Sequence, residues 1–209
     1  MIRASLLALA ACFLTTSIQA EDKAGEWKNL WDGKTMDGWK ANEHKDSWKI
    51  ADGAIVCHGE RSHLFYVGED KPFKNFEFEC EVMTTPGSNA GIYFHTKYQE
   101  TNWPRFGQEC QVNVSQSDPK KSGSLYGVVD VLDPPLKDNE WYTTYIKVEG
   151  RHVIIKVNDT TTVDYTEPEG KEAFSESFER RLGEGTFALQ AHDPGSKVYF
   201  RNLKVRRLP

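Results

Sequence analysis

Apolar and polar residues alternate along most of the chain after residue 75. The segment FEFECEV, residues 76–82, is typical, with a glutamate between each pair of apolar side chains. Successive side chains of a β-strand point to opposite faces, so a period of two predicts half-buried strands. The predicted strands cover residues 76–82, 90–98, 107–114, 142–150, 152–158, 185–192 and 197–208.

Short polar turns separate these strands. The sequences EGR at 149–151 and ND at 158–159 lie between β-branched runs, which is typical of hairpins. No glycine-rich phosphate loop is present, which excludes Rossmann and kinase folds, and the one helical period is a short one over 171–178. The pattern therefore predicts an all-β protein, a two-sheet antiparallel jelly-roll sandwich.

The first 20 residues have the order of a secretory signal peptide. One basic residue precedes an apolar run over residues 6–14, and small and polar residues follow as far as Ala20. The run is too short to span a bilayer, and no later segment is apolar enough. We expect an exported protein, periplasmic or secreted, whose mature part is one domain of residues 21–209. Lipid attachment at Cys12 is the less favoured alternative.

Composition narrows the class of partner. The 209 residues include 26 Lys and Arg against 31 Asp and Glu, a net charge of −5, and 12% are aromatic. Nucleic acids and anionic membranes require a basic surface, so the sequence predicts neither as a partner. After the leader come Cys57, Cys80 and Cys110, which allow at most one disulfide. Cys80 and Cys110 alternate with polar residues, which predicts that both are buried in an apolar core.

Three predicted strands combine an apolar face with an unusual polar one. The polar faces hold Glu109, Gln111 and Asn113, then Tyr93, His95 and Lys97, then Gln190 and His192. The apolar faces include Cys110, Val112, Phe94 and Leu189. A face exposed only to solvent typically carries Glu, Lys and Thr rather than amides and imidazoles, and the three glutamates of residues 76–82 are an example. We expect the polar faces to line one side of a sheet and form a groove for a neutral, hydroxyl-rich ligand.

One tryptophan lies beside this expected groove. Trp103 belongs to a long connection, residues 96–106, immediately before the strand that carries Glu109. Sugar rings stack their apolar faces on aromatic planes. Trp103 is therefore a candidate platform or lid for a carbohydrate.

Several short motifs follow one another in the order of a known family. They are LWDGK at 30–34, DGW at 37–39, Trp48 with DG at 52–53, SNAGI at 88–92, GQECQV at 107–112, SGSLYG at 122–127, NEW at 139–141, and GTFALQAH at 185–192 followed by FRNL at 200–203. With these motifs the chain resembles the exported bacterial 3-keto-disaccharide hydrolase-like family. That resemblance implies the concanavalin-A-like lectin/glucanase jelly roll. It also places the family's conserved G-x-E-x-Q residues on Glu109 and Gln111, and its Leu-Gln-x-His on Gln190 and His192.

The resemblance implies cleavage of a glycoside that carries a ketone at carbon 3. Such an elimination needs a base, an electrophile for the enolate oxygen and an acid for the leaving group. The candidate bases are Glu109 and His192, and the candidate acids or orienting groups are His95 and Tyr126. Candidate oxygen ligands are Gln111, Gln190 and Arg105, with Tyr93, Asn113 and Trp103 as further substrate contacts. A divalent cation is an alternative electrophile, with Glu109, His95 and His192 as candidate ligands, although no spacing demands one.

Two other functions suit the same fold. A retaining glucanase needs two carboxylates about 5–5.5 Å apart, but the residue two positions after Glu109 is the amide Gln111. That mechanism is disfavoured on this strand unless a loop acid such as Asp130 or Asp193 completes it. A non-catalytic carbohydrate-binding module needs only an amide-rich groove with Trp103. Titratable groups on the groove face favour the enzyme over the binding module.

Overall fold

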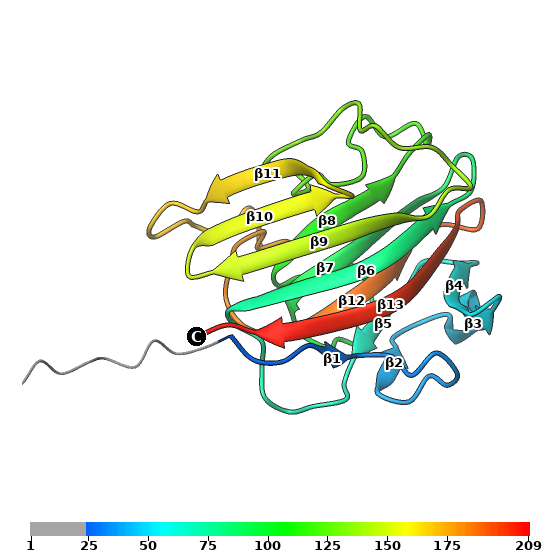
Figure 1. Ribbon diagram of the computed structural model, residues 1–209, viewed down its shortest axis with the longest axis horizontal. Helices are drawn as coiled ribbons and strands as arrows, with labels where there is room; N and C mark the ends of the chain where they lie inside the picture. Colours follow the sequence, from blue (N-terminus) through cyan, green and yellow to red (C-terminus); the bar gives the residue numbers. More distant parts are fainter. Residues whose placement is uncertain (1–23) are drawn as a thin grey trace, which may run out of the picture.

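The computed structural model describes residues 24–209, which form two antiparallel sheets packed face to face (Figure 1). The larger sheet has the order β11 (Thr160–Thr166), β10 (His152–Val157), β9 (Tyr142–Glu149), β6 (Phe76–Thr84), β13 (Lys197–Arg207), β4 (Ala54–His58) and β3 (Trp48–Ala51), with β1 (Lys28–Asn29) paired to β13. The smaller sheet has the order β2 (Trp39–Ala41), β5 (Ser62–Tyr66), β12 (Thr186–Ala191), β7 (Asn89–Thr96) and β8 (Gln108–Asn113). The expected signal peptide and Cys12 lie outside the described residues.

The all-β, two-sheet prediction is confirmed, and each of the seven predicted strands is present. Between residues 24 and 209 no helix is long and apolar enough to cross a membrane. The one helix in this part of the chain is a 3-10 turn, η1 (Lys45–Ser47). The helix predicted over 171–178 is wrong, because turn bonds such as Phe178 N–H to Ser175 Oγ hold that segment in a loop.

The core lies between the sheets and follows the predicted alternation. On β6, Phe76, Phe78, Cys80 and Val82 are buried, and they face inward residues of the smaller sheet such as Phe187. Cys57, Cys80 and Cys110 are free and buried, as small apolar core residues are expected to be. Burial raises the pKa of the Cys57 thiol to about 12, so this group stays protonated.

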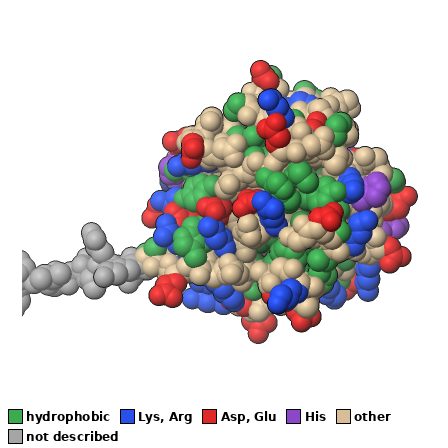
Figure 2. Space-filling view, turned by 45° about the vertical axis from the view of Figure 1, so that its right-hand side comes forward, with side chains coloured by type: hydrophobic (Ala, Val, Ile, Leu, Met, Phe, Trp, Pro, Cys, Tyr) green, Lys and Arg blue, Asp and Glu red, His purple; other side chains and the backbone are tan. Residues whose placement is uncertain are grey.

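The outer face of the larger sheet carries a ladder of ion pairs between β6 and β13. Glu77 pairs with Arg206, Glu79 with Lys204 at 2.7 Å and Glu81 with Arg201 at 2.6 Å across β6 and β13. Figure 2 shows basic, acidic and apolar side chains intermingled over the face it presents. The glutamates of residues 76–82 are therefore used to pair strands β6 and β13.

A β-bulge in β7 overturns one prediction from the alternation. Tyr93 pairs with Ala188 and Thr96 with Thr186, so β7 uses one residue more than β12 between these pairs. His95 absorbs the extra residue in a left-handed conformation, φ 57°. Its ring turns away from the outer face and packs 5.4 Å from the ring of Phe76. The prediction that His95 shares a face with Glu109 is therefore wrong.

Candidate active site

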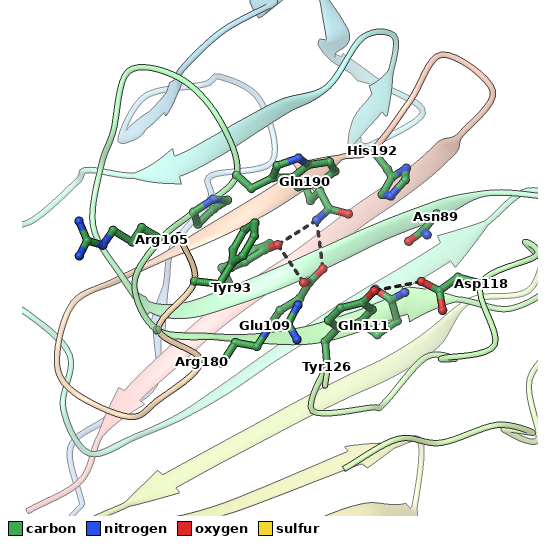
Figure 3. A pocket seen from close by; sticks show the side chains of 14 residues that line it. Asn89, Tyr93, Arg105, Glu109, Gln111, Asp118, Tyr126, Arg180, Gln190 and His192 are labelled. Atoms are coloured by element: carbon green, nitrogen blue, oxygen red, sulfur yellow. Dashed lines mark hydrogen bonds between the residues drawn. The ribbon is translucent and has the colours of Figure 1, made fainter. Parts of the chain in front are cut away.

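A pocket of about 190 Å³ opens on the outer face of the smaller sheet (Figure 3), where β7, β8 and β12 are neighbouring strands. Pockets for drug-sized ligands span about 300–1,000 Å³, so this one suits a smaller ligand or one part of a larger one. Its lining comes from the three strands and from the loops around them: Asn89, Tyr93, Trp103, Pro104, Arg105, Gly107, Glu109, Gln111, Asp118, Tyr126, Phe178, Arg180, Gln190 and His192.

Glu109 lies on the pocket floor between two hydrogen-bond donors (Figure 3). Tyr93, its partner in the β7–β8 register, donates its hydroxyl to Oε2 at 2.8 Å. Gln190 Nε2 donates to Oε1 at 3.0 Å. Burial raises the pKa of Glu109 to about 7, although the bonds from Tyr93 and Gln190 act to lower it. The carboxyl therefore exchanges a proton near neutral pH, as a general base requires.

A glycine beneath Glu109 makes room for its carboxyl. Gly91 lies on β7 next to Gln111 in the register, and a Cβ at Gly91 would collide with Glu109 Oε1. Tyr93 and Gln190 are both buried, so the donors on the carboxylate are held in place by packing. The position of Glu109 is therefore defined by its own strand β8 together with the two strands β7 and β12.

His192 and Trp103 form another wall of the pocket. His192 Nδ1 lies 2.7 Å from Asp193 Oδ2, and the His192 ring centre lies 5.2 Å from that of Trp103. Trp103 also packs against the buried ring of His63, at 5.3 Å. The carboxylate of Asp193 therefore orients the His192 imidazole at this wall.

The opposite wall is built by the loop after β8. Gln111 Nε2 donates to the Lys120 carbonyl at 3.3 Å, and the Tyr126 hydroxyl donates to Asp118 Oδ2 at 3.2 Å. Burial and the neighbouring Asp118 charge raise the pKa of Tyr126. This phenol is therefore neutral near neutral pH and has a proton to donate.

Two buried amide oxygens on the pocket lining have no hydrogen-bond partner within residues 24–209. They are Asn89 Oδ1 and Gln190 Oε1, whose residues are 2% and 1% exposed. Buried polar atoms are almost always paired in native proteins. Hydroxyl groups of a bound ligand are suited to donate to both oxygens.

Two of the residues selected from the sequence do not line the pocket. His95 accepts a hydrogen bond from Gly183 N–H at Nδ1 and lies 2.8 Å from the Lys74 carbonyl through Nε2. Asn113 donates to the carbonyls of Asp118 and Lys120, at 3.0 and 3.1 Å. Both side chains hold loops in place instead of facing a ligand.

The cation ligands suggested by the sequence are not brought together. His95 lies outside the pocket that holds Glu109 and His192. Within the described residues no group of three or more His, Cys, Asp or Glu is placed to hold a metal ion. The predicted set Glu109, His95 and His192 therefore does not fit a cation.

Six lining residues were absent from the predicted site residues: Asn89, Pro104, Gly107, Asp118, Phe178 and Arg180. Asn89 stands in the SNAGI motif, so its place in the family pattern was the available signal. Arg180 and Phe178 belong to the segment around the wrongly predicted helix, and they reach the pocket only through loop folding. Nothing local in the sequence distinguishes Arg180 from its neighbour Arg181.

The fold is that of the sandwiches of the concanavalin-A-like lectin/glucanase type. The non-specific endo-beta-1,3(4)-glucanase SCLam of family GH16 superposes with a TM-score of 0.53 at 10% identity, over 92% of this chain and 93% of its own. A Parabacteroides distasonis protein, provisionally described as a glycosyl hydrolase, superposes with a TM-score of 0.69 at 23% identity, over 88% of this chain and 94% of its own.

The chain belongs to the 3-keto-alpha-glucoside-1,2-lyase-like domain family, whose model matches residues 26–206. A 3-keto-disaccharide hydrolase of Bacteroides thetaiotaomicron is 27% identical over 240 residues, covering 92% of this chain and 82% of the relative. The family expected from the sequence motifs is therefore confirmed.

Proposed function

We propose that this protein cleaves the glycosidic bond of 3-keto glycosides by elimination and hydration, a net hydrolysis. The observation that carries the proposal is Glu109, a carboxyl with a pKa of about 7 on the floor of the pocket. The family and its Bacteroides relative, a 3-keto-disaccharide hydrolase, support the substrate class.

The first step is proton abstraction. The ketone at carbon 3 acidifies the hydrogen on carbon 2, and Glu109 removes it as the base. The electron pair of the C–H bond forms the carbon 2–carbon 3 double bond of an enolate, and the negative charge moves to the carbonyl oxygen. Tyr93 and Gln190 position the carboxylate for this transfer.

The second step expels the group at carbon 1. The enolate re-forms the ketone, a carbon 1–carbon 2 double bond forms, and the bond from carbon 1 to the leaving oxygen breaks. That oxygen needs a proton, for which His192, oriented by Asp193, is the best-placed donor, with Tyr126 on the opposite wall. Water then adds across the double bond, with its hydroxyl on carbon 1 and its hydrogen on carbon 2.

A retaining glucanase mechanism receives less support from the site. Gln111 occupies the position on β8 where the strand would carry a second carboxylate. Asp118 is the other acid on the lining, and its oxygens accept bonds from Tyr126 and from Lys120 N–H. The elimination needs one carboxylate base, which this arrangement supplies.

The test compares a 3-keto glycoside with its unoxidised parent. The mature protein is expected to release aglycone from the keto substrate only. Glu109→Gln keeps shape and most hydrogen bonds but removes the base, so kcat should fall about 10²- to 10⁴-fold with little change in binding. Glu60→Gln, an exposed glutamate outside the pocket, is the matched control.

Three outcomes would contradict the proposal. Cleavage of the unoxidised parent at an equal rate would identify a glycosidase of another mechanism. Binding of the keto sugar without turnover by the well-folded protein would identify a carbohydrate-binding module. Full activity in Glu109→Gln with an unchanged melting temperature would remove Glu109 from the mechanism.

Export of the protein, proposed from its first 20 residues, is tested separately by fractionating cells.

A further inference from the structure

Arg180 presents a cation to the pocket without an acidic partner of its own. Figure 3 shows its side chain directed toward Glu109, whereas Arg105 points away from it. Within residues 24–209, Arg180 has neither an ion pair nor a side-chain hydrogen bond, while its neighbour Arg181 pairs with Glu179 at 2.7 Å. A guanidinium has five donors, and those of Arg180 are free for a ligand.

The surroundings of Arg180 hold its guanidinium at this place. It stacks over the rings of Phe174 at 4.3 Å and Tyr126 at 5.0 Å. A Cβ at Gly127 would collide with Nη1, so this glycine leaves the space that the guanidinium fills. The backbone of Arg180 is left-handed, φ 45°, a conformation costly for a non-glycine residue and concentrated at functional sites.

Hydrogen bonds on both sides of Arg180 tie its loop to the sandwich. Glu179 N–H donates to the Arg105 carbonyl at 2.8 Å. On the other side Leu182 N–H donates to the Glu167 carboxylate at 3.0 Å, and Gly183 N–H donates to His95. The cation therefore has a defined position relative to β7 and β8.

We propose that Arg180 is the electrophile of the reaction: it binds the ketone oxygen at carbon 3 and stabilises the enolate that forms when Glu109 removes the hydrogen at carbon 2. This inference rests on the proposed function. Carbon 2 and carbon 3 are neighbours, so the base and the cation must reach the ring from adjoining positions, as Glu109 and Arg180 do. A fixed cation at a developing oxyanion lowers the barrier without reorganisation.

The electrostatics of the pocket agree with this role. The positive charge of Arg180 acts to lower the pKa of Glu109 and of Tyr93. Apart from the exposed Arg105, Arg180 is the one Lys or Arg side chain on the lining of the described pocket. This role falls to Arg180 instead of Arg105, the arginine selected from the sequence.

The test uses Arg180→Gln, Arg180→Lys and the matched control Arg181→Gln, with two substrates. The first is a nitrophenyl 3-keto glucoside, which reports aglycone release. The second is a 3-keto sugar lacking any group at carbon 1, which reports only exchange of the carbon 2 hydrogen in deuterated water. Arg180→Gln should lower kcat and the exchange rate about 10²- to 10³-fold with a small change in KM.

Two further readouts separate catalysis from loop structure. Arg180→Lys keeps the charge and should recover part of the loss. Without the Arg180 charge the pKa of Glu109 rises, so the acidic limb of kcat/KM in Arg180→Gln should move to higher pH. Arg181→Gln should change neither kcat, nor the hydrogen-exchange rate, nor the pH of the acidic limb of kcat/KM.

The results distinguish the role of Arg180 from the cleavage reaction itself. Two results for Arg180→Gln would overturn the role of Arg180 and leave the cleavage proposal intact. One is a kcat within threefold of wild type. The other is a change in KM alone, with the acidic limb of kcat/KM at the same pH as in wild type. Hydrogen exchange that depends on Arg180, with no release of aglycone, would support Arg180 and overturn cleavage. Absence of both activities from the wild-type protein would overturn both.

Discussion

At the scale of the residue, the chemistry depends on the surroundings of Glu109 more than on the residue itself. A solvated glutamate has a pKa near 4.3 and would be a weak base. The pocket raises this pKa to about 7, while the hydroxyl of Tyr93 limits the rise by donating to the charged form. The proton affinity of the base is thus set by two opposing effects, desolvation and hydrogen bonding.

This balance predicts the pH dependence of the activity. A base acts in its ionised form, so kcat/KM should fall as the pH drops through about 7. Tyr93→Phe removes a donor to the carboxylate, so the pKa of Glu109 should rise and the acidic limb should move up by about one pH unit. Initial rates on a 3-keto glycoside between pH 5 and 9 measure the acidic limb of the wild-type protein and of the variant. An acidic limb that moves down in Tyr93→Phe would contradict this account of Glu109.

At the scale of the element, the bulge in β7 allows one strand both to line the pocket and to bind the loop that carries Arg180. Before the bulge, β7 places Tyr93 in the pocket, and after it His95 receives the Gly183 N–H and so holds the loop that carries Arg180. Burial lowers the pKa of His95 to about 4, so the ring stays neutral and able to accept this bond. The bulge therefore couples the sheet to the loop above the site.

Removing the His95 contacts should loosen that loop without unfolding the sandwich. His95→Phe keeps an aromatic ring against Phe76 but loses both hydrogen bonds, so the Gly183 amide should exchange its hydrogen about tenfold faster. Amide hydrogen exchange measures this effect, and trypsin should cleave faster within residues 171–183. His152→Phe, at an exposed histidine of β10, is the control. Unaltered exchange of Gly183 in His95→Phe would show that other contacts hold the loop.

At the scale of the whole molecule, two buried histidines affect stability. Burial lowers the pKa of His63 to about 3 and that of His95 to about 4, and neither His63 ring nitrogen has a hydrogen-bond partner within residues 24–209. Below pH 6.5 the unfolded chain binds protons at these two sites while the folded one does not. The two histidines therefore leave the free energy of unfolding unchanged above pH 6.5 and lower it as the pH falls below 6.5.

Glu109 acts in the opposite direction. Its raised pKa means that the folded protein binds its proton first, so between about pH 7 and 4.5 this carboxyl favours folding as the pH falls. Two histidines outweigh one carboxyl. Between pH 6 and 5, above the range in which the carboxyls with a lowered pKa (Glu69, Glu77 and Glu81) titrate, the free energy of unfolding should therefore decrease by about 1.4 kcal/mol for each pH unit that the pH falls.

Replacement of His63 tests this balance. His63→Leu removes one of the two histidine contributions, so the dependence on pH should nearly vanish in that interval. Urea unfolding at several pH values between 4.5 and 7 measures the slope for both proteins. An equal slope in wild type and variant would mean that the pKa of His63 is the same in the folded protein and in the unfolded chain.

The sequence by itself determined the sandwich and much of the pocket floor. Period-two alternation is a local property, because each side chain takes its face from the pleat of its own strand. The seven strands, the buried Cys80 and Cys110, and the outward direction of Glu109 and Gln111 could all be predicted in this way.

Only the tertiary structure decided which polar residues meet. One extra residue in β7 inverts His95, a change that the alternation cannot reveal because the bulge is defined by pairing with β12. Arg180 reaches the pocket because its neighbours Glu179 and Leu182 donate backbone N–H groups to the Arg105 carbonyl and the Glu167 carboxylate, and Arg105 and Glu167 lie 75 and 13 residues from Arg180 in sequence. Loop positions depend on such long-range contacts, so the proposed base could be found from the strand pattern, whereas the proposed electrophile required the fold.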